Sequence, residues 1–527
     1  MGIPFLAYIV GGLWIISAVF DYAYFTYFAQ LKEYRIDRFR DFLSTQAGKD
    51  ELFGYRILWR SLLVVVLYTL LHGMLSNLFL LGTIISIDIL TKVYCVLRKS
   101  IRRPVVTAKT LVIIGSLVVF EILLLFFLPY INIILLILIF RWFFTGVVVV
   151  LLSIPSSLTK KIYIIAATKK IASYKKLRVI GITGSYGKSS TKEFLSQILA
   201  SKYTIKKTPK NINTEIGVAK HILSTNFSND DVYVVEMGAY RIKEIQNICD
   251  MVHPTIGILT AIAPQHLSLF GSMENIAQAK QELLLSLPKD GWAITNVDNE
   301  YCRQVIKNLS CHVRTFGSDE DYKPDVLITD IENTKTGISY TVSDEYMRMT
   351  VSLNILGKHN TFNIIPAAIA AKKIGMTDEE INTAVEKLTP GHGSITFVPY
   401  GKAVIINDSY NSNPEGFKAA LDLLNTFPST KRRIVITRGM RELGDLSDQL
   451  HEQIGGEISF VADELVITEK DVAPPLTQGI VSKFHTDIKH MYSPQELLEY
   501  VQSLKDSDVV ILIENRLHTM VTKELGI

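Results

Sequence analysis

The sequence predicts a multi-pass α-helical membrane domain followed by an α/β region with a phosphate-binding loop and a largely parallel sheet. Of the 527 residues, 48% are hydrophobic and only 20% are charged, whereas soluble domains carry about 25% charged residues. The apolar residues concentrate before about Thr168, and strand and helix patterns alternate after it. A glycine-rich segment at residues 181–191 follows one of these strands and opens a helix.

Charge and cysteine content argue against two classes of protein. The 55 basic and 51 acidic residues give a net charge of +4, which is too weak a bias to indicate a nucleic-acid partner. The four cysteines form no CxxC pair. Neither a zinc site nor a disulfide framework is therefore expected, and the cysteine content agrees with a reducing compartment.

Four long apolar runs mark the predicted membrane domain. They cover residues 1–28, 61–97, 105–129 and 131–154, and their charged residues are Asp21, Asp88, Lys92, Lys109, Glu121 and Arg141. About 20 apolar residues cross a bilayer. As one helix, run 61–97 would be about 55 Å long, against a hydrocarbon core of about 30 Å. We therefore expect two short helices that turn near His72 and Gly73, giving five spans, with four as the alternative.

Basic residues between the apolar runs predict the orientation. They cluster within residues 32–60, 98–103 and 160–170, and basic loops stay on the cytoplasmic side of a membrane. Five spans with the N-terminus outside place all three clusters inside, so the α/β region is expected in the cytoplasm, attached to a lipid bilayer. No basic region precedes the first apolar run, so a cleaved signal peptide is not expected.

Two of the intramembrane charges are expected to pair. Glu121 lies eight residues before Pro129, and Arg141 lies ten residues after Ile131. A tight hairpin at residues 129–130 would bring both side chains to a similar depth. Charges within a bilayer need partners and are functional candidates, and the alternative is a structural ion pair that orders the hairpin.

Residues 181–191 (GITGSYGKSST) have the features of a phosphate-binding loop. Glycines let backbone N–H groups wrap around phosphate oxygens, and the helix N-terminus adds a favourable dipole. Lys188 is placed to reach the β- and γ-phosphates, and the Ser189 hydroxyl to bind Mg²⁺. The strict pattern has glycine at position 182, where this chain has Ile182. The residues predicted to bind ATP here are Gly184, Ser185, Gly187, Lys188, Ser189 and Ser190.

Further segments, in chain order, extend this pattern. They are residues 211–217 (NINTEIG), 236–238 (EMG), 265–267 (QHL), 270–272 (FGS), 279–280 (AK), 356–360 (LGKHN) with Asn363, 408–414 (DSYNSNP) and 442–444 (ELG). Together with GxTGxxGKSS they resemble the Mur ligase family over residues 177–527. Within that family the resemblance is greatest to the members that add D-alanyl-D-alanine to the muramoyl peptide.

The resemblance implies a domain organisation and an activity. A central ATP-binding domain at residues 177–390 and a C-terminal Rossmann-like α/β domain at 391–527 would follow a linker at 156–176. The membrane domain, residues 1–155, stands where the family has a domain for a UDP-sugar substrate. The implied activity is ATP-dependent: a carboxylate of a cell-wall precursor becomes an acyl phosphate, and an amino acid or dipeptide amine captures it as an amide. The implied location is the bacterial cytoplasmic (inner) membrane.

The resemblance also implies roles for individual residues. The catalytic set would be Lys188, Glu236, His266 and Lys280, and magnesium would be held by Ser189, Glu236, His266 and a carbamylated Lys280. The ATP site would further include His359, Asn360 and Asn363 near the adenine, and Asp408 near the ribose or phosphates. The substrate side would include Asn211, Asn213, Tyr410, Asn411 and Asn413. The plain alternatives are a surface carboxylate, a loop histidine, a helix-surface lysine and turn-forming asparagines.

The chain departs from the family pattern in two motifs. Ser394 stands where relatives have an arginine, and His392, Arg438 or Arg441 are the candidates to supply the missing cation. Residues 513–516 read IENR, where the D-alanyl-D-alanine-adding relatives carry Lys-Gly-Ser-Arg. This second departure leaves the identity of the amino donor open.

The predicted membrane domain also indicates which kind of acceptor the ligase uses. A ligase core attached directly to membrane spans, without an evident UDP-sugar domain, indicates a lipid-linked precursor, and the alternative is an anchor for an enzyme that uses a soluble acceptor. Another function also stays open: a membrane-anchored nucleotide-binding scaffold that recruits cell-wall synthesis enzymes and does not ligate. An ATP-driven transporter is a weaker interpretation, because Glu121 and Arg141 alone do not make a route.

Overall fold

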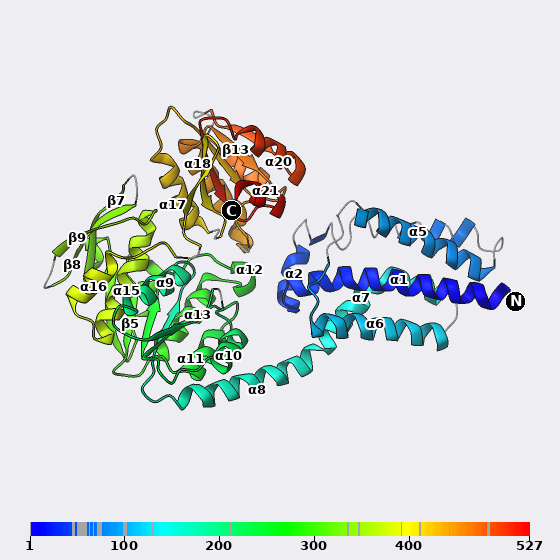
Figure 1. Cartoon of the computed structure of the whole chain (residues 1–527), viewed down its shortest axis with the longest axis horizontal. Helices are drawn as coiled ribbons and strands as arrows, with labels where there is room; N and C mark the ends of the chain where they lie inside the picture. The colour runs from blue at the N-terminus through cyan, green and yellow to red at the C-terminus, as the bar shows by residue number, and fades with distance from the viewer. Residues whose placement is uncertain are drawn as a thin grey trace. The chain divides into compact units, whose positions relative to one another are not determined.

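The computed structural model describes residues 2–44, 48–49, 61–62, 64–66, 68–70, 76–97, 103–127, 131–210, 212–334, 337–345, 348–391, 393–410, 413–441, 443–481 and 485–527. The chain, drawn in Figure 1, divides into two compact units, Met1–Lys160 and Lys161–Ile527. Each unit has hydrophobic clusters of its own. The turns predicted near His72 and Gly73 and at residues 129–130 lie outside the described residues.

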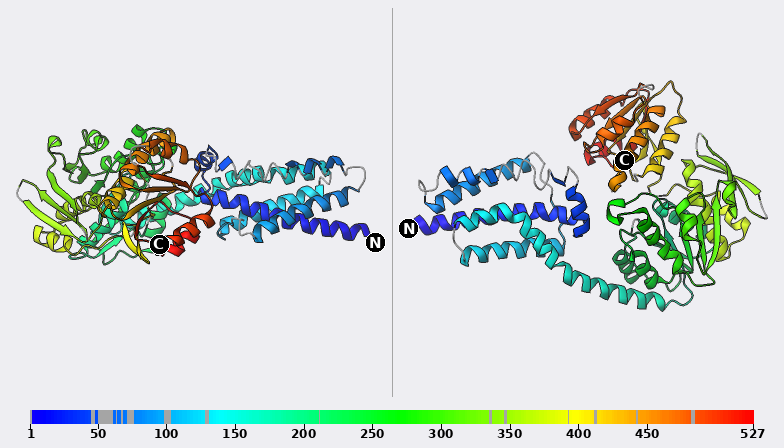
Figure 2. Two further views of the ribbon diagram at one scale, coloured as in Figure 1. Left: turned by 90° about the horizontal axis from the view of Figure 1, so that it is seen from above. Right: turned by 180° about the vertical axis from the view of Figure 1, so that it is seen from behind.

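The first unit is helical. Its helices are α1 (Gly2–Leu31), α2 (Ile36–Ser44), α5 (Asn77–Leu97), α6 (Ala108–Phe127) and α7 (Ile131–Leu151), and α8 (Ser153–Ala172) continues into the second unit. Helix α1 packs against α5, α6 and α7 (Figure 2). Within the described part of the chain, four stretches are long and apolar enough to cross a membrane: Phe5–Leu31, Asn77–Tyr94, Ala108–Phe127 and Ile133–Leu151. The crossing itself and the number of spans stay predictions.

A buried group of charges joins these helices. Arg141 donates from Nε to Glu121 Oε1 (2.8 Å) and from Nη2 to Glu121 Oε2 (2.9 Å), which confirms the predicted pair. The same guanidinium contacts Asp21 Oδ2 at 2.9 Å. Lys92 in turn contacts Asp21 (3.0 Å) and Asp88 (2.6 Å). Acidic and basic groups therefore alternate from α5 through α1 and α7 to α6.

The second unit begins with a nine-stranded sheet of order β2-β3-β1-β4-β5-β6-β7-β8-β9. The strands are β1 (Arg178–Thr183), β2 (Ile205–Lys207), β3 (Val232–Glu236), β4 (Ile256–Leu259), β5 (Trp292–Asn296), β6 (His312–Gly317), β7 (Val326–Asn333), β8 (Ile338–Ser343) and β9 (Arg348–Leu353). Neighbours from β2 to β7 are parallel, and β8 and β9 add antiparallel pairs.

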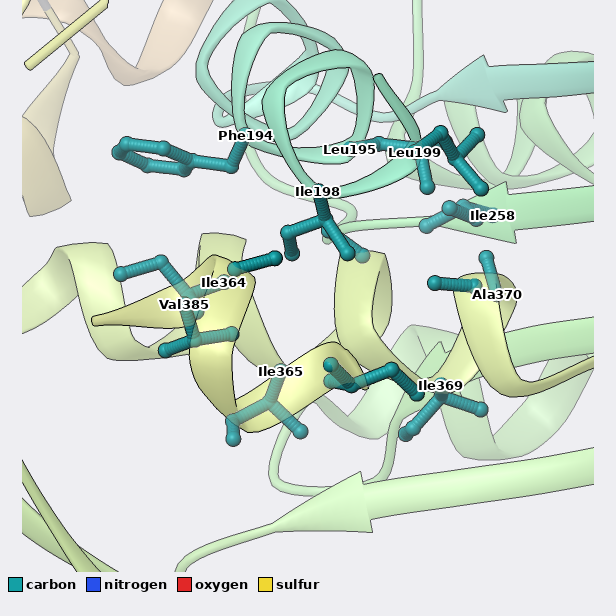
Figure 3. Close-up of a cluster of buried hydrophobic side chains, with 14 of the residues drawn as sticks. Phe194, Leu195, Ile198, Leu199, Ile258, Ile364, Ile365, Ile369, Ala370 and Val385 are labelled. Carbon is teal, nitrogen blue, oxygen red and sulfur yellow. The ribbon is translucent and has the colours of Figure 1, made fainter. Parts of the chain in front are cut away.

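Helices cover both faces of this sheet, because alternate strand residues point to opposite sides. One core contains α9 (Lys188–Leu199), α15 (Thr361–Ile374) and α16 (Asp378–Val385). The other contains α10 (Glu215–Ser224), α11 (Glu244–Val252), α13 (Met273–Leu285), α14 (Glu300–Val305) and the end of α8. Figure 3 shows Ile198 of α9 between Ile258 of β4 and Ile364 of α15. This packing fixes the start of α9 at the carboxyl end of β1.

The remainder of the second unit is a six-stranded sheet of order β10-β11-β15-β12-β13-β14. Its strands are β10 (Thr396–Tyr400), β11 (Ala403–Asp408), β12 (Arg432–Thr437), β13 (Glu464–Ile467), β14 (Asp487–His490) and β15 (Val509–Glu514). Helices α17 (Pro414–Asn425), α18 (Ser447–Val461) and α19 (Ala473–Gly479) share one core, and α20 (Pro494–Ser503) and α21 (Thr519–Leu525) share another. All pairs except β10–β11 are parallel. The prediction of α/β domains with parallel sheets is confirmed.

Candidate active site

The glycine-rich loop connects β1 to α9, as the sequence indicates. Gly184 (φ 150°) and Gly187 (φ 79°) have backbone angles that side chains rarely allow. A Cβ at Gly184 would lie 2.0 Å from Thr260 Oγ1, and one at Gly187 would lie 2.3 Å from Asn363 Oδ1. At both positions a side chain would lie too close to a neighbouring residue and would strain the backbone, so glycine is favoured for two reasons.

The segment after β4 supports this loop. Ser185 donates its backbone N–H to the Ala261 carbonyl (2.8 Å), and its hydroxyl donates to the Ala263 carbonyl (2.9 Å). The Thr260 hydroxyl donates to the Tyr186 carbonyl at 2.5 Å. Since β1 and β4 are parallel neighbours, both loops leave the same edge of the sheet. That edge is where open α/β sheets place their ligands.

Lys188 lies at the start of α9 and turns back over the loop. Its Nζ donates to the carbonyls of Gly184 (2.6 Å) and Ser185 (3.1 Å). Burial lowers the pKa of Lys188, and the charge of Glu236 opposes that shift. Ser190, in the same first turn, was also predicted to bind the nucleotide. A phosphate group can replace the two carbonyls as the partner of this ammonium, because it is a stronger, charged acceptor.

Glu236 ends β3 and is held by three donors. Ser189 Oγ lies 2.9 Å from Oε2, Lys192 Nζ lies 3.0 Å from Oε2, and Asn213 Nδ2 lies 3.0 Å from Oε1. The structure thus brings Ser189 and Glu236 together as predicted. It places Asn213, predicted on the substrate side, against the same carboxylate.

The sequence reasoning missed Lys192. This residue is fully buried and lies four positions after Lys188, so both project from one side of α9. The available signal was this spacing from Lys188 within the first turns of the helix that follows the phosphate loop. Lys192 also donates to the Lys210 carbonyl, which ties the loop before residue 211 to Glu236. Asn211 itself lies outside the described residues.

The oxygen donors Ser189 and Glu236 fit Mg²⁺. Magnesium prefers oxygen ligands and usually keeps water and substrate phosphates in its shell, so two protein oxygens suffice for a nucleotide-bound ion. Among the described residues, no cluster of three or more His, Cys, Asp or Glu side chains is arranged to hold a metal. His266, at the start of α12 (Leu267–Phe270), contacts the Tyr240 ring at 4.6 Å between centroids. Its metal role stays a prediction.

Lys280 lies on α13 and is only 2% exposed. Burial lowers its pKa well below the ordinary lysine value, and the charge of Lys188 lowers it further. A neutral amine is the form that reacts with CO₂, so this environment favours carbamylation, whereas the predicted helix-surface alternative does not fit a buried side chain.

The segment predicted near the adenine forms the short helix η2 (Lys358–Asn360) and the start of α15. Asn363 donates to Asn360 Oδ1 at 3.1 Å, and Asn360 donates to the Leu356 carbonyl at 2.8 Å. Asn363 also borders Gly187 of the phosphate loop. Burial lowers the pKa of His359 to about 4. The neutral form of its imidazole is therefore favoured.

The residues predicted from the C-terminal domain surround the end of β11. Asp408 is 6% exposed, and burial raises its pKa to about 7. Tyr410 is 42% exposed, and burial, then the charge of Glu236, raises its pKa. Asn413 caps α17 by accepting the Gly416 N–H at 2.9 Å, a structural role that the sequence left open as the turn alternative. Asn411 lies outside the described residues.

The candidates to replace the missing arginine are engaged elsewhere. The Arg438 guanidinium donates to Glu469 and to the Arg516 carbonyl (3.1 Å), and Arg441 donates to Glu469 at 3.0 Å. The Ser394 hydroxyl is buried and has no hydrogen-bond partner among the described residues. His392 lies outside the described residues, as does Glu442 of the last motif.

Two family models match the chain. The Mur ligase middle domain matches residues 182–371, and the Mur ligase glutamate ligase domain matches residues 395–513. The UDP-N-acetylmuramoyl-tripeptide–D-alanyl-D-alanine ligase of Bacillus subtilis is 29% identical over 341 residues, covering 64% of this chain and 72% of that protein. The protein of the same name from Buchnera aphidicola subsp. Baizongia pistaciae is 31% identical over 343 residues, with the same two coverages.

Solved structures share this fold. MurF from Acinetobacter baumannii superposes with a TM-score of 0.62 at 25% identity, covering 70% of this chain and 80% of its own. The MurF ligase from Thermotoga maritima in complex with ADP gives a TM-score of 0.60 at 24% identity, covering 70% and 84%. Both matched family domains lie in the second unit, where the phosphate loop, Glu236 and Asp408 are found.

Proposed function

Because the chain belongs to the Mur ligase family, and is therefore an ATP-dependent ligase that forms peptide bonds, we propose that it joins a cell-wall precursor to an amino acid or dipeptide while anchored in a bacterial cytoplasmic membrane. The observation that carries the proposal is the convergence of Lys188, Ser189 and Glu236 at the carboxyl edge of one parallel sheet. Its relatives by name act on a UDP-muramoyl tripeptide and D-alanyl-D-alanine.

The proposed reaction has two steps. A carboxylate oxygen of the precursor attacks the γ-phosphorus of ATP, and ADP leaves. The donor amine then attacks the resulting acyl phosphate, and inorganic phosphate leaves with the bridging oxygen. Both steps concentrate negative charge, so the site must supply cationic and N–H groups. Lys188 and the loop N–H groups meet this need at the phosphates, and Lys192 and Asn213 hold Glu236 in place.

Ser189 and Glu236 are the residues proposed to hold Mg²⁺, which would neutralise charge on the β- and γ-phosphates. In this proposal a carbamylated Lys280 and His266 would complete a second metal position. Carbamylation would replace a buried neutral amine by an anion, which the positive charge of Lys188 would favour. That exchange suits the burial of Lys280, and the charge of Lys188 lowers the pKa of its amine.

The first unit is proposed as the membrane anchor. Four of its described stretches have the length and composition of spans, and the α/β domains are proposed on the cytoplasmic side, where ATP is available. Both family models lie beyond residue 181, and the anchored core suits a lipid-linked acceptor. A soluble UDP-linked acceptor is the alternative, and comparison of the two substrates with detergent-solubilised protein distinguishes them.

A second candidate function is a nucleotide-binding scaffold that assembles cell-wall synthesis enzymes without ligation. The observation that favours it is the Ser394 hydroxyl, buried without a partner, combined with Arg438 and Arg441 engaged by Glu469. A chain that binds ATP but forms no ADP with any acceptor and amine would be this scaffold.

The test is ADP formation by the full chain in detergent, with acceptor and amine supplied together or singly. The ligase predicts ADP only when both are present, and Lys188→Ala should lower the rate at least 100-fold, since the lost cation faces the transferred phosphoryl group. Lys202→Ala is the matched control, because Lys202 is an exposed lysine just beyond the same helix and pairs with Glu380. Equal rates in Lys188→Ala and the control would reject the proposal.

A further inference from the structure

Helix α8 is one continuous helix (Figure 1), and one of its faces is buried in the second unit. Ala167 is 0% exposed and Ile171 is 5% exposed, and Ile164 packs against the same hydrophobic core. These three residues are spaced i, i+3 and i+7, which places them on one side of a helix. The packing therefore fixes which side of α8 the second unit covers.

The opposite face of α8 is apolar and exposed. Leu158, Ile162 and Ile165 are 59%, 67% and 56% exposed, and their spacing of i, i+4 and i+7 also places them on one side. At 3.6 residues per turn, this side is turned about 150° away from the buried face. Large aliphatic side chains that gather on one exposed helix face indicate a contact surface.

Lysines share this exposed face. Lys161 and Lys169 are both exposed, and the helical period places them beside Ile162 and Ile165. The sequence of α8 contains four lysines and no acidic residue. Self-association through this face would therefore bring lysines of two copies together without any acidic residue of α8 to pair with them. An anionic lipid surface complements both the charge and the aliphatic side chains.

The chain connection places the start of this face near the predicted membrane boundary. The candidate span Ile133–Leu151 ends two residues before α8 begins at Ser153. At a rise of 1.5 Å per residue, Leu158 lies about 10 Å along the chain from the end of that span, and Lys169 about 16 Å further. A helix that lies along the bilayer surface would keep the whole face at the interface.

We propose that this face, made up of Leu158, Lys161, Ile162, Ile165 and Lys169, binds the surface of an anionic lipid bilayer. The aliphatic side chains enter the boundary between headgroups and acyl chains, and the two ammonium groups extend to the headgroups. The inference rests on the proposed membrane anchor and adds to it. Because the second unit begins at Lys161, the ligase unit then has a lipid contact of its own, which keeps it at the bilayer where a lipid-linked acceptor would be presented.

The test maps lipid contacts along the full chain. The protein is reconstituted in vesicles of phosphatidylcholine, with or without phosphatidylglycerol, that contain a trace of phosphatidylcholine with a photoreactive diazirine near the headgroup end of its acyl chain. Peptide mass spectrometry locates the lipid adducts after illumination. We expect adducts within residues 158–169 as well as in the candidate spans, and at least threefold more adducts at 158–169 when phosphatidylglycerol is present.

The aliphatic part of the face is tested by the double variant Ile162→Ser with Ile165→Ser. It should lower the adducts at residues 158–169 at least fivefold and leave those in the candidate spans unchanged. Leu285→Ser is the matched control, because Leu285 is an exposed leucine of α13, and it should preserve the α8 adducts.

The charged part is tested by Lys161→Glu with Lys169→Glu, which should abolish the difference between the two vesicle types. Lys175→Glu with Lys176→Glu makes the same change of charge at two exposed lysines just after α8. This control pair should retain most of the difference, because these lysines lie outside the proposed face.

Two results would overturn the inference while leaving the anchor in place. One is labelling of the candidate spans without adducts at residues 158–169, and the other is equal α8 labelling in both vesicle types. Absence of adducts from the candidate spans as well would contradict the proposed membrane anchor itself, and the inference would fall with it.

Discussion

Two groups of buried acidic residues in this molecule are balanced in opposite ways. In the helical unit, Arg141 and Lys92 each lie between two carboxylates. Glu121 also receives hydrogen bonds from Trp14 and Tyr22. At the edge of the C-terminal sheet, the buried carboxyl groups of Asp408 and Glu514 adjoin each other and share a hydrogen bond, which requires a proton on one of them.

The difference separates ionised groups that join helices from carboxyl groups that retain a proton. Acidic groups that the chain pairs for itself hold helices together, since every ionised group in a low-dielectric interior needs a partner. Two buried carboxyl groups that hydrogen-bond to each other retain a proton more readily than isolated ones, so their charge depends on pH. Glu236 is intermediate, because Lys192 and Asn213 hold it while its Ser189 contact uses an oxygen that also suits Mg²⁺.

The largest expected effect is in the helical unit. Arg141→Ala leaves Glu121 and Asp21 buried without their shared cation, and breaking such a pair costs about 3–5 kcal/mol. Thermal unfolding of the detergent-solubilised chain should show the loss, whereas Arg103→Ala, at an exposed arginine, should leave it nearly unchanged. The double variant Arg141→Met with Glu121→Gln should lose less than Arg141→Ala. Equal stability of Arg141→Ala and wild type would remove the contrast between the two regions.

A smaller loss is expected at Glu236. Lys192→Met removes a buried cation whose bond to the carboxylate contributes about 1.5–3 kcal/mol, the range for hydrogen bonds to charged groups. Unfolding by urea, followed through the second unit, measures it. The neighbouring exposed Lys202→Ala is again the matched control. If the two variants unfold at the same urea concentration, Lys192 does not hold Glu236.

The smallest expected effect has the opposite sign. Glu514→Gln should stabilise the chain by about 1–3 kcal/mol at pH 8, because glutamine carries no charge in this buried site and its amide can donate to Asp408, and by less at pH 5. The sign follows from the raised pKa values of Glu514 and Asp408. The folded state binds protons more tightly than the unfolded state, so wild-type stability falls as pH rises from about 4 toward 7. Unfolding temperatures at pH 5 and pH 8 measure this, and a variant less stable than wild type at pH 8 would show that the Glu514 carboxyl group stabilises the folded state at that pH.

Local sequence predicted the phosphate loop well, because the glycines, Lys188 and Ser189 are consecutive and their geometry follows from one strand–loop–helix unit. The Glu121–Arg141 pair could also be predicted, since a hairpin between the two apolar runs would bring both side chains to a similar depth. Asp21, Asp88 and Lys92 were not predicted as their partners, because that contact requires α1 and α5 to pack beside α6 and α7. The adjacency of Asp408 and Glu514 depends on β15 inserting between β11 and β12, which no local pattern encodes.

The central claim is that ATP activates a carboxylate by phosphorylating it, and an oxygen label tests this most directly. The acceptor carboxylate is labelled with ¹⁸O in both oxygens, and the full chain is supplied with ATP and the amine. The account predicts one ¹⁸O in the released inorganic phosphate for each amide formed, with ADP as the nucleotide product. Unlabelled phosphate, or label in AMP, would contradict it.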